Sequence, residues 1–123
     1  MSDLVLWLYV INSVLLIDHE IDSAYWKEWE LFRLRGGITG FLLLHIPLLF
    51  VILLGLVLIT RHSWWGSVFS LLVCLGGLFA FAAHSYFLRK GRPQFNNWVS
   101  KCILVAILLV SIIQAVVTLY RIG

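Results

Sequence analysis

The chain has 123 residues, of which 62% are hydrophobic and 12% are charged, and its formal net charge is +3. A soluble domain carries about a quarter of its residues as charged side chains, because its surface faces water. This composition therefore excludes an ordinary soluble domain. The basic residues sit at the ends of apolar segments and form no basic face, which excludes a nucleic-acid partner. We expect an integral membrane protein.

Four apolar segments approach the length of about 20 residues that a helix needs to cross the hydrocarbon at ~1.5 Å per residue. The predicted spans cover residues 4–25, 38–59, 65–88 and 98–120. The first span is the least regular, because its uncharged run ends at Ile17 and acidic side chains follow at once. The N-terminal residues lack the positive flank of a secretory signal, so we expect this span to remain in the mature protein.

These segments predict an all-α fold, a four-helix transmembrane bundle that forms one domain over the whole chain. An open sheet would leave backbone groups unpaired in lipid. After the first span, a mixed aromatic and charged segment leads to the glycine pair at positions 36 and 37. We expect this segment to be an interfacial extension of the first helix, anchored by Trp26, Trp29 and Phe32. The glycine pair should end it.

The lysines and arginines are distributed unevenly over the two sides of the predicted bundle. One side carries seven of them, namely Lys27, Arg33, Arg35, Arg89, Lys90, Arg92 and Lys101. The other side carries two, Arg61 and Arg121. Because positive residues remain on the cytoplasmic side of a membrane, we expect both termini to be extracytoplasmic.

Three of the four histidines lie at the same depth in the membrane when the predicted helices are arranged in this topology. His19 lies near the cytoplasmic end of the first helix. At ~1.5 Å per residue, His45 lies roughly 10 Å from the start of the second helix and His84 roughly 7 Å from the end of the third. All three therefore lie in the cytoplasmic leaflet.

Helical spacing predicts that His19 and His84 point into the bundle. The first helix has a polar stripe formed by Asn12, His19, Asp22 and Ser23, and such a stripe should avoid lipid. Gly77 and Ala80 share the face of His84, and small residues mark the sides on which membrane helices approach closely. The neighbours of His45 are large and apolar all round, so its direction is not predicted.

Three imidazoles and one carboxylate from three helices make a ligand set for Zn²⁺ or Fe²⁺. The predicted metal site consists of His19, Asp22, His45 and His84, with Asp18 and Glu20 placed to orient a ligating histidine. If the protein is an enzyme, the natural chemistry is a metal-bound water attacking a lipid ester or amide. Asp18 or Glu20 would then accept the proton.

Three alternatives to the metal site stay open at this point. Each histidine could simply bond a backbone carbonyl or a serine within the packed bundle. Two of the three histidines could hold a b-type haem for redox chemistry. The chain could also be an accessory subunit of a larger membrane complex, or a homo-oligomer, with histidines that bind a pigment or nothing. Membrane lipids are expected partners in every case.

Two further features concern packing. Asn12 and Gln114 lie at similar depth on the first and fourth helices, which predicts a hydrogen bond between their side chains. Cys74 and Cys102 lie at different depths, which argues against a disulfide.

The stretches Asp18–Phe32, Phe41–Pro47 and His84–Pro93 resemble a family of small prokaryotic membrane proteins, a domain of unknown function. This resemblance covers most of the chain and implies a prokaryotic inner-membrane location, but no mechanism. The chain is also loosely similar to the membrane family named for a His-x-x-Glu-Glu motif. Here that motif would be His19-x-x-Asp22-Ser23, so both acidic positions depart from it.

Overall fold

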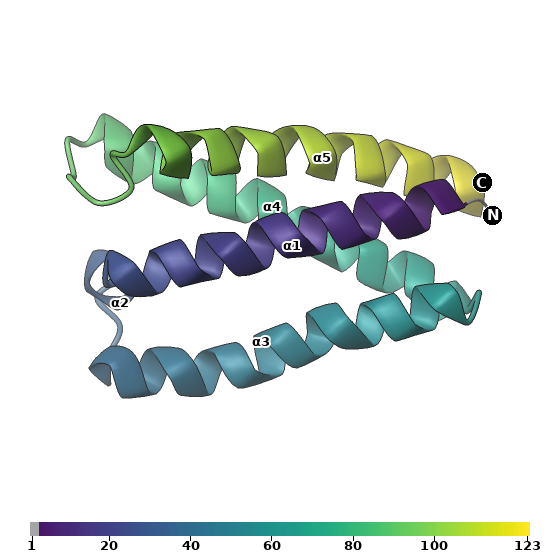
Figure 1. The fold of residues 1–123 in the computed structure, drawn as a ribbon, viewed down its shortest axis with the longest axis horizontal. Helices are drawn as coiled ribbons and strands as arrows, with labels where there is room; N and C mark the ends of the chain where they lie inside the picture. Colours follow the sequence, from purple (N-terminus) through teal and green to yellow (C-terminus); the bar gives the residue numbers. More distant parts are fainter. Residues whose placement is uncertain (1–2) are drawn as a thin grey trace.

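The computed structural model describes residues 3–123 and confirms the all-α prediction, with helices and no strand in that range. The helices are α1 (Asp3–Tyr25), α2 (Glu28–Leu31), α3 (Gly37–Thr60), α4 (Trp64–Arg89) and α5 (Trp98–Ile122) (Figure 1). All but α2 are long and apolar enough to cross a membrane. Of the N-terminal residues that bear on the signal-peptide expectation, Met1 and Ser2 lie outside the described range.

The four long helices run along the long axis of the molecule, and both termini lie at the same end (Figure 1). The short helix α2 and the loop between α4 and α5 lie at the opposite end, which we call the α2 end. Helix α5 packs against α4 and α1, whereas α3 packs against α4, α1 and α2. Helix α3 therefore lies on the side of the bundle away from α5.

The contact between α1 and α3 at mid-bundle is polar as well as apolar. The Tyr9 hydroxyl donates a hydrogen bond to the Ile52 carbonyl oxygen at 2.7 Å. A Cβ atom at Gly55 would collide with the Tyr9 ring and hydroxyl, so the missing side chain of this glycine lets the tyrosine approach α3. Tyr9 and Ile52 belong to the buried apolar core, together with Ile59, Val73 and Ile107.

The predicted bond between the Asn12 and Gln114 side chains is confirmed. Asn12 Nδ2 donates to Gln114 Oε1 at 2.9 Å and to Ser111 Oγ at 3.1 Å. Gln114 Nε2 in turn donates to Ser70 Oγ at 2.9 Å, and Ser70 bonds the Thr118 hydroxyl at 2.9 Å. This network joins α1, α4 and α5 in the buried interior. Both cysteines are free, as expected.

The segment after α1 is a separate short helix rather than a continuation of α1. The backbone of Lys27 has a left-handed φ of 54°, a conformation that ends a right-handed helix. Aromatic packing then folds the segment back over the bundle: the Trp29 ring lies 5.5 Å from Phe41, and the Phe32 ring lies 5.3 Å from Phe87, between ring centroids. As a result, the first side chain of α2, Glu28, reaches the buried interior.

Candidate metal centre

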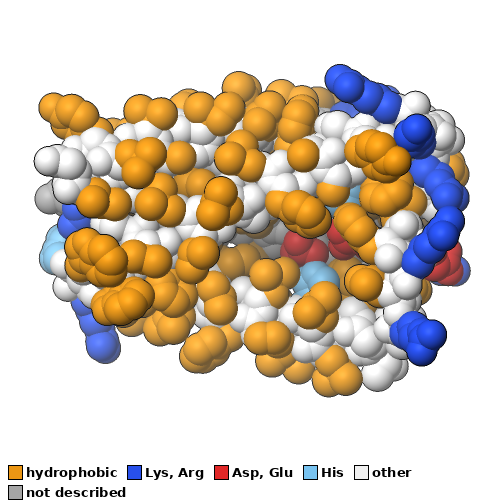
Figure 2. Space-filling model, turned by 180° about the vertical axis from the view of Figure 1, so that it is seen from behind, with side chains coloured by type: hydrophobic (Ala, Val, Ile, Leu, Met, Phe, Trp, Pro, Cys, Tyr) orange, Lys and Arg blue, Asp and Glu red, His pale blue; other side chains and the backbone are white. Residues whose placement is uncertain are grey.

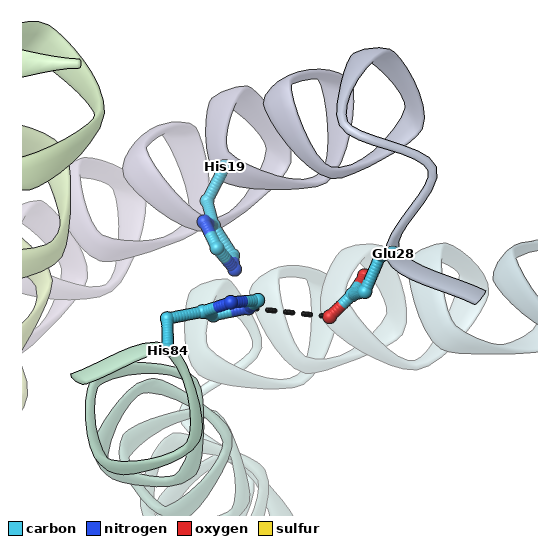
Figure 3. Close-up of side chains that lie close together, drawn as sticks. All are labelled: His19, Glu28 and His84. Carbon is cyan, nitrogen blue, oxygen red and sulfur yellow. Dashed lines mark ion pairs between the residues drawn. The ribbon is translucent and has the colours of Figure 1, made fainter. Parts of the chain in front are cut away.

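Two buried histidines and one glutamate converge at the α2 end of the bundle. His19 comes from α1, His84 from α4 and Glu28 from α2 (Figure 3). Both histidines are only 1% exposed, and their ring centroids lie 4.6 Å apart. His84 Nε2 lies 3.2 Å from Glu28 Oε1. One ligand atom of each residue lies within 4.8 Å of the others, so a single ion could contact all three.

The inward direction of His84 follows from close packing between α4 and α5. A Cβ atom at Gly77 would collide with Ser111 and Ile107 of α5, so this glycine sets the distance between the two helices. His84 lies two turns farther along the same face and is buried, as predicted. His19 is likewise buried on the same face of α1 as Asn12.

A second group of ligand-type side chains lies beside the first. His45 Nε2 of α3 lies 2.6 Å from Glu20 Oε2 of α1. Ligand atoms of Glu20, Glu28 and His45 also lie within 4.8 Å of one another. Glu28 therefore belongs to both groups, and the two groups together bring three histidines and two glutamates from four helices to one place.

The ring of His45 is oriented by a backbone carbonyl. His45 Nδ1 lies 2.6 Å from the Phe41 carbonyl oxygen, and because an oxygen of this kind only accepts, Nδ1 must carry the proton. With Nδ1 protonated, the contact of 2.6 Å between Nε2 and Glu20 Oε2 is a hydrogen bond that needs one proton between the two atoms, and a bound ion would take the place of that proton. Histidines that bind metals have this arrangement, with one nitrogen donating to a carbonyl and the other ligating.

The main electrostatic feature of the centre is the pair of carboxylates of Glu20 and Glu28. Burial opposes ionisation of the Glu28 carboxylate, but its hydrogen bond with His84 and the charges of His84 and His19 outweigh that cost, so the pKa of Glu28 lies below its usual value. Two carboxylates nonetheless lie close together, with side chains only 19% and 16% exposed for Glu20 and Glu28. Both members of such a pair can be ionised only beside positive charge.

The two most buried histidines also have unsatisfied nitrogens. The Nδ1 atoms of His19 and His84 are buried and have no hydrogen-bond partner within residues 3–123. Buried polar atoms are rarely left unpaired, and each exception calls for an explanation such as a bound ion. Phe95, in the loop between α4 and α5, covers this side of the centre, with ring centroids 4.1 Å from His84 and 5.6 Å from His19.

A cavity of about 420 Å³ adjoins the centre and lies between α1, α3 and α4. Its polar wall is formed by His19, Glu20, Glu28, His45 and His84. The rest of its lining is apolar and comes mainly from α3 and α4. Figure 2 shows the face on which it opens: acidic and histidine side chains are visible in a hollow surrounded by hydrophobic side chains. Lysines and arginines gather at the ends of the molecule, mostly at one end.

The single metal site predicted from His19, Asp22, His45 and His84 is divided in the structure: His19 and His84 belong to one group, His45 belongs to the other, and Asp22 lies in neither. Asp22 lines a separate depression with Trp26, Asn96 and Asn97. Asp18 is exposed, whereas Glu20 contacts the Nε2 atom of His45. The structure therefore offers Glu28 in the position that Asp22 was expected to hold.

A family model described as "Family of unknown function (DUF6713)" matches residues 5–121. The chain belongs to this family. The expected resemblance to a family without assigned function is therefore confirmed, but the loose similarity to the His-x-x-Glu-Glu family has no support in this match. No curated protein matches the chain, and no solved structure matches it.

Sequence reasoning on this DUF6713 chain missed two residues of the centre, Glu28 and Phe95. Glu28 was assigned to the interfacial segment, where a carboxylate in headgroup water needs no explanation. A signal was present nevertheless, since Glu28 lies between Trp26 and Trp29, whose rings favour burial of the segment. For Phe95, the signal was a large apolar side chain in an otherwise polar loop.

Proposed function

We propose that this DUF6713 protein is an integral membrane metal-binding protein with two adjacent ion positions that share Glu28. One position is formed by His19, Glu28 and His84, and the other by Glu20, Glu28 and His45. The observation that carries the proposal is the convergence of ligand atoms in both groups, each within 4.8 Å, at the buried end of the bundle. Two-metal sites in proteins hold their ions about 3.5–4 Å apart, which suits a shared carboxylate.

The donor chemistry supports Zn²⁺ or Fe²⁺. Imidazole nitrogens combined with carboxylate oxygens suit these ions, whereas Mg²⁺ and Ca²⁺ prefer oxygen ligands alone. A cation would offset the repulsion between Glu20 and Glu28 and would take one nitrogen of each histidine as a ligand. Each position has three protein ligands and leaves a further coordination position open, as in catalytic rather than structural zinc sites.

The open coordination position supports the lipid-active chemistry expected from the sequence. A water bound there would lose a proton near neutral pH and could attack an ester or amide carbonyl. When only the position formed by His19, Glu28 and His84 holds an ion, Glu20 is not a ligand, and its carboxylate lies close enough to Glu28 to accept that proton. Asp18 is exposed, which leaves Glu20 as the better acceptor of the two that the sequence suggested.

A b-type haem is favoured less than an ion by the same geometry. A haem held by two histidines lies between their rings. The rings of His19 and His84 are only 4.6 Å apart and 72° from parallel, and Phe95 packs against both. A macrocycle between them would have to displace these contacts, whereas an ion would not. Optical absorbance of the purified protein separates haem or pigment from metal ions.

Elemental analysis of the purified protein tests the proposal. We expect two Zn²⁺ or Fe²⁺ ions per wild-type chain after reconstitution in detergent, because the two ligand groups are adjacent. His84→Ala and His45→Ala should each retain one ion, and Glu28→Gln, which preserves the size of the side chain, should retain neither. His62→Ala is the matched control, because His62 is exposed between α3 and α4 and should leave the metal content unchanged.

Two results would contradict the proposal. One is a wild-type protein that remains metal-free after reconstitution at micromolar ion concentration. The other is a Glu28→Gln variant that elutes as wild type in size-exclusion chromatography, has the same helical circular dichroism, and binds as much metal. In that case the histidines and glutamates form buried ion pairs instead, and the accessory-subunit alternative takes the place of the metal centre.

A further inference from the structure

The cavity beside the candidate metal centre has one polar end and one apolar end. The polar end consists of the histidines and glutamates already described. The apolar end is lined by Leu48, Val51 and Ile52 of α3 and by Leu72, Val73 and Gly76 of α4. Its volume of about 420 Å³ falls within the range of about 300–1,000 Å³ found for ligand pockets. This division matches an amphiphile rather than a uniformly polar or apolar ligand.

The apolar end reaches toward the middle of the spanning helices. Ile52 lies seven residues from His45 along α3, which corresponds to roughly 10 Å. A water-soluble substrate would have to lose its hydration to occupy this space, at a cost of several kcal/mol for an unpaired polar group. The hydrocarbon chain of a lipid incurs no such cost.

The cavity also opens toward lipid rather than toward water. Leu44 and Phe79 line it and are 56% and 65% exposed, and both lie within spanning helices. In Figure 2 the hollow with the acidic and histidine side chains is bordered by hydrophobic side chains, while the lysines and arginines lie at the ends of the molecule. A ligand can therefore reach the centre sideways from the bilayer.

We infer that this cavity binds one acyl chain of a membrane phospholipid and brings the ester group of that lipid to the metal centre. The position of the ester rests on the proposed function, because it needs the ion. The position of the acyl chain does not rest on the proposed function, since it depends only on the shape and the apolar lining of the cavity. The substrate class of the proposed centre is then an acyl ester of the surrounding bilayer.

Gly76 provides a direct way to fill the cavity. A Cβ atom built on this residue meets no atom within 4 Å, so a larger side chain would occupy free space without displacing the backbone. Gly76→Leu should therefore compete with the acyl chain and leave the fold intact. Leu48→Trp fills the same space from α3 and serves as a second variant. Ala82→Leu adds the same kind of bulk on an exposed face of α4 outside the cavity and is the matched control.

Photolabelling in reconstituted vesicles tests the inference. The probe is phosphatidylcholine with a diazirine near the middle of one acyl chain, and labelled residues are identified by mass spectrometry. We expect the label to concentrate on cavity residues of α3 and α4, and Gly76→Leu and Leu48→Trp to lower this labelling several-fold. Ala82→Leu should leave it unchanged. Labelling spread evenly over the outer faces, or unchanged in both cavity-filling variants, would overturn the inference.

Two further results separate the possible failures. A metal-free protein that still labels in the cavity would contradict the metal centre and leave the lipid site intact. A Gly76→Cys variant that forms a disulfide with a second copy in the membrane, with no labelling of the wild-type cavity, would overturn the lipid site. It would show instead that a helix of a neighbouring chain covers the cavity.

Discussion

The hydrogen-bond network around Asn12 and Gln114 allows a quantitative test of how the bundle is held together. Replacing Asn12 by Leu removes a bond of 2.9 Å to Gln114 and one of 3.1 Å to Ser111. Replacing Gln114 by Leu removes the first of these bonds and the bond of 2.9 Å to Ser70. Leu has the branched heavy-atom shape of Asn and one side-chain heavy atom fewer than Gln, so loss of the bonds should dominate over changes in packing.

The expected magnitudes follow from the number of bonds broken and the atoms left unpaired. Hydrogen bonds between membrane helices are worth ~0.6 kcal/mol on average and up to ~1.7 kcal/mol, and an unpaired buried polar group costs about 1–3 kcal/mol. Each single variant breaks three bonds of the network, because Asn12 Oδ1 also accepts from Ser111 Oγ at 3.4 Å and Gln114 Nε2 also donates to the Ser70 carbonyl oxygen at 3.3 Å. We expect a loss of about 2–3 kcal/mol. The double variant should lose about 1 kcal/mol less than the sum, because the bond common to both is counted twice and neither amide is left without the other.

The assay is the free energy of unfolding in detergent micelles, measured for the wild type, both single variants and the double variant. Ser13→Ala is a control on α1, because the Ser13 hydroxyl is buried and has no hydrogen-bond partner in the described part of the chain. Its removal should cost little or stabilise the protein. Losses that add strictly in the double variant would refute the coupling, and a costly Ser13→Ala would show that packing rather than bonding dominates.

Two other predictions concern topology and pH. With the native cysteines replaced, Gly91→Cys should react with an impermeant thiol reagent from the cytoplasmic side and Gly123→Cys from the opposite side; labelling of both from one side would contradict the four-span topology. In the metal-free protein, the lowered pKa of Glu28 means that its stabilising contribution is present above ~4.3, the usual value of a glutamate, and is lost as the pH falls further. Glu28→Gln should therefore unfold with a weaker pH dependence on the acid side, and an unchanged acid profile would count against this assignment.

Hydrophobic length and helical spacing were sufficient to predict the four helices and much of the interior. Each of the four long helices includes a predicted span and exceeds it by no more than two residues at either end. The inward faces followed from residue types, because Gly77 marks the close approach of α4 to α5 and polar residues such as Asn12 avoid lipid. These features depend on local sequence and on the membrane as solvent, and neither needs knowledge of how the helices are arranged around one another.

The ligand set could not be completed in the same way. Each residue advances about 100° around an α-helix, so Glu20 and Asp22 lie on opposite flanks of His19. The sequence does not say on which flank α3 lies, and therefore which of the two acids meets His45. The role of Glu28 depends on the left-handed conformation of residue 27. This position is a lysine and not a glycine or asparagine, the residues that usually indicate such a conformation in a sequence. The place of Glu28 is determined by aromatic contacts that form only in the folded protein.

The order of the five side chains of the candidate metal centre along the chain has a consequence for biosynthesis. His19 is the first of them and His84 the last, so all are present once the third long helix has left the ribosome and entered the bilayer. Helix α5 supplies no ligand. It brings instead Gln114, the partner of Asn12, and it follows the loop that places Phe95 over the two innermost histidines. Translation would thus produce an open, ion-accessible intermediate first, and the final helix would close it from the side opposite the lipid cavity.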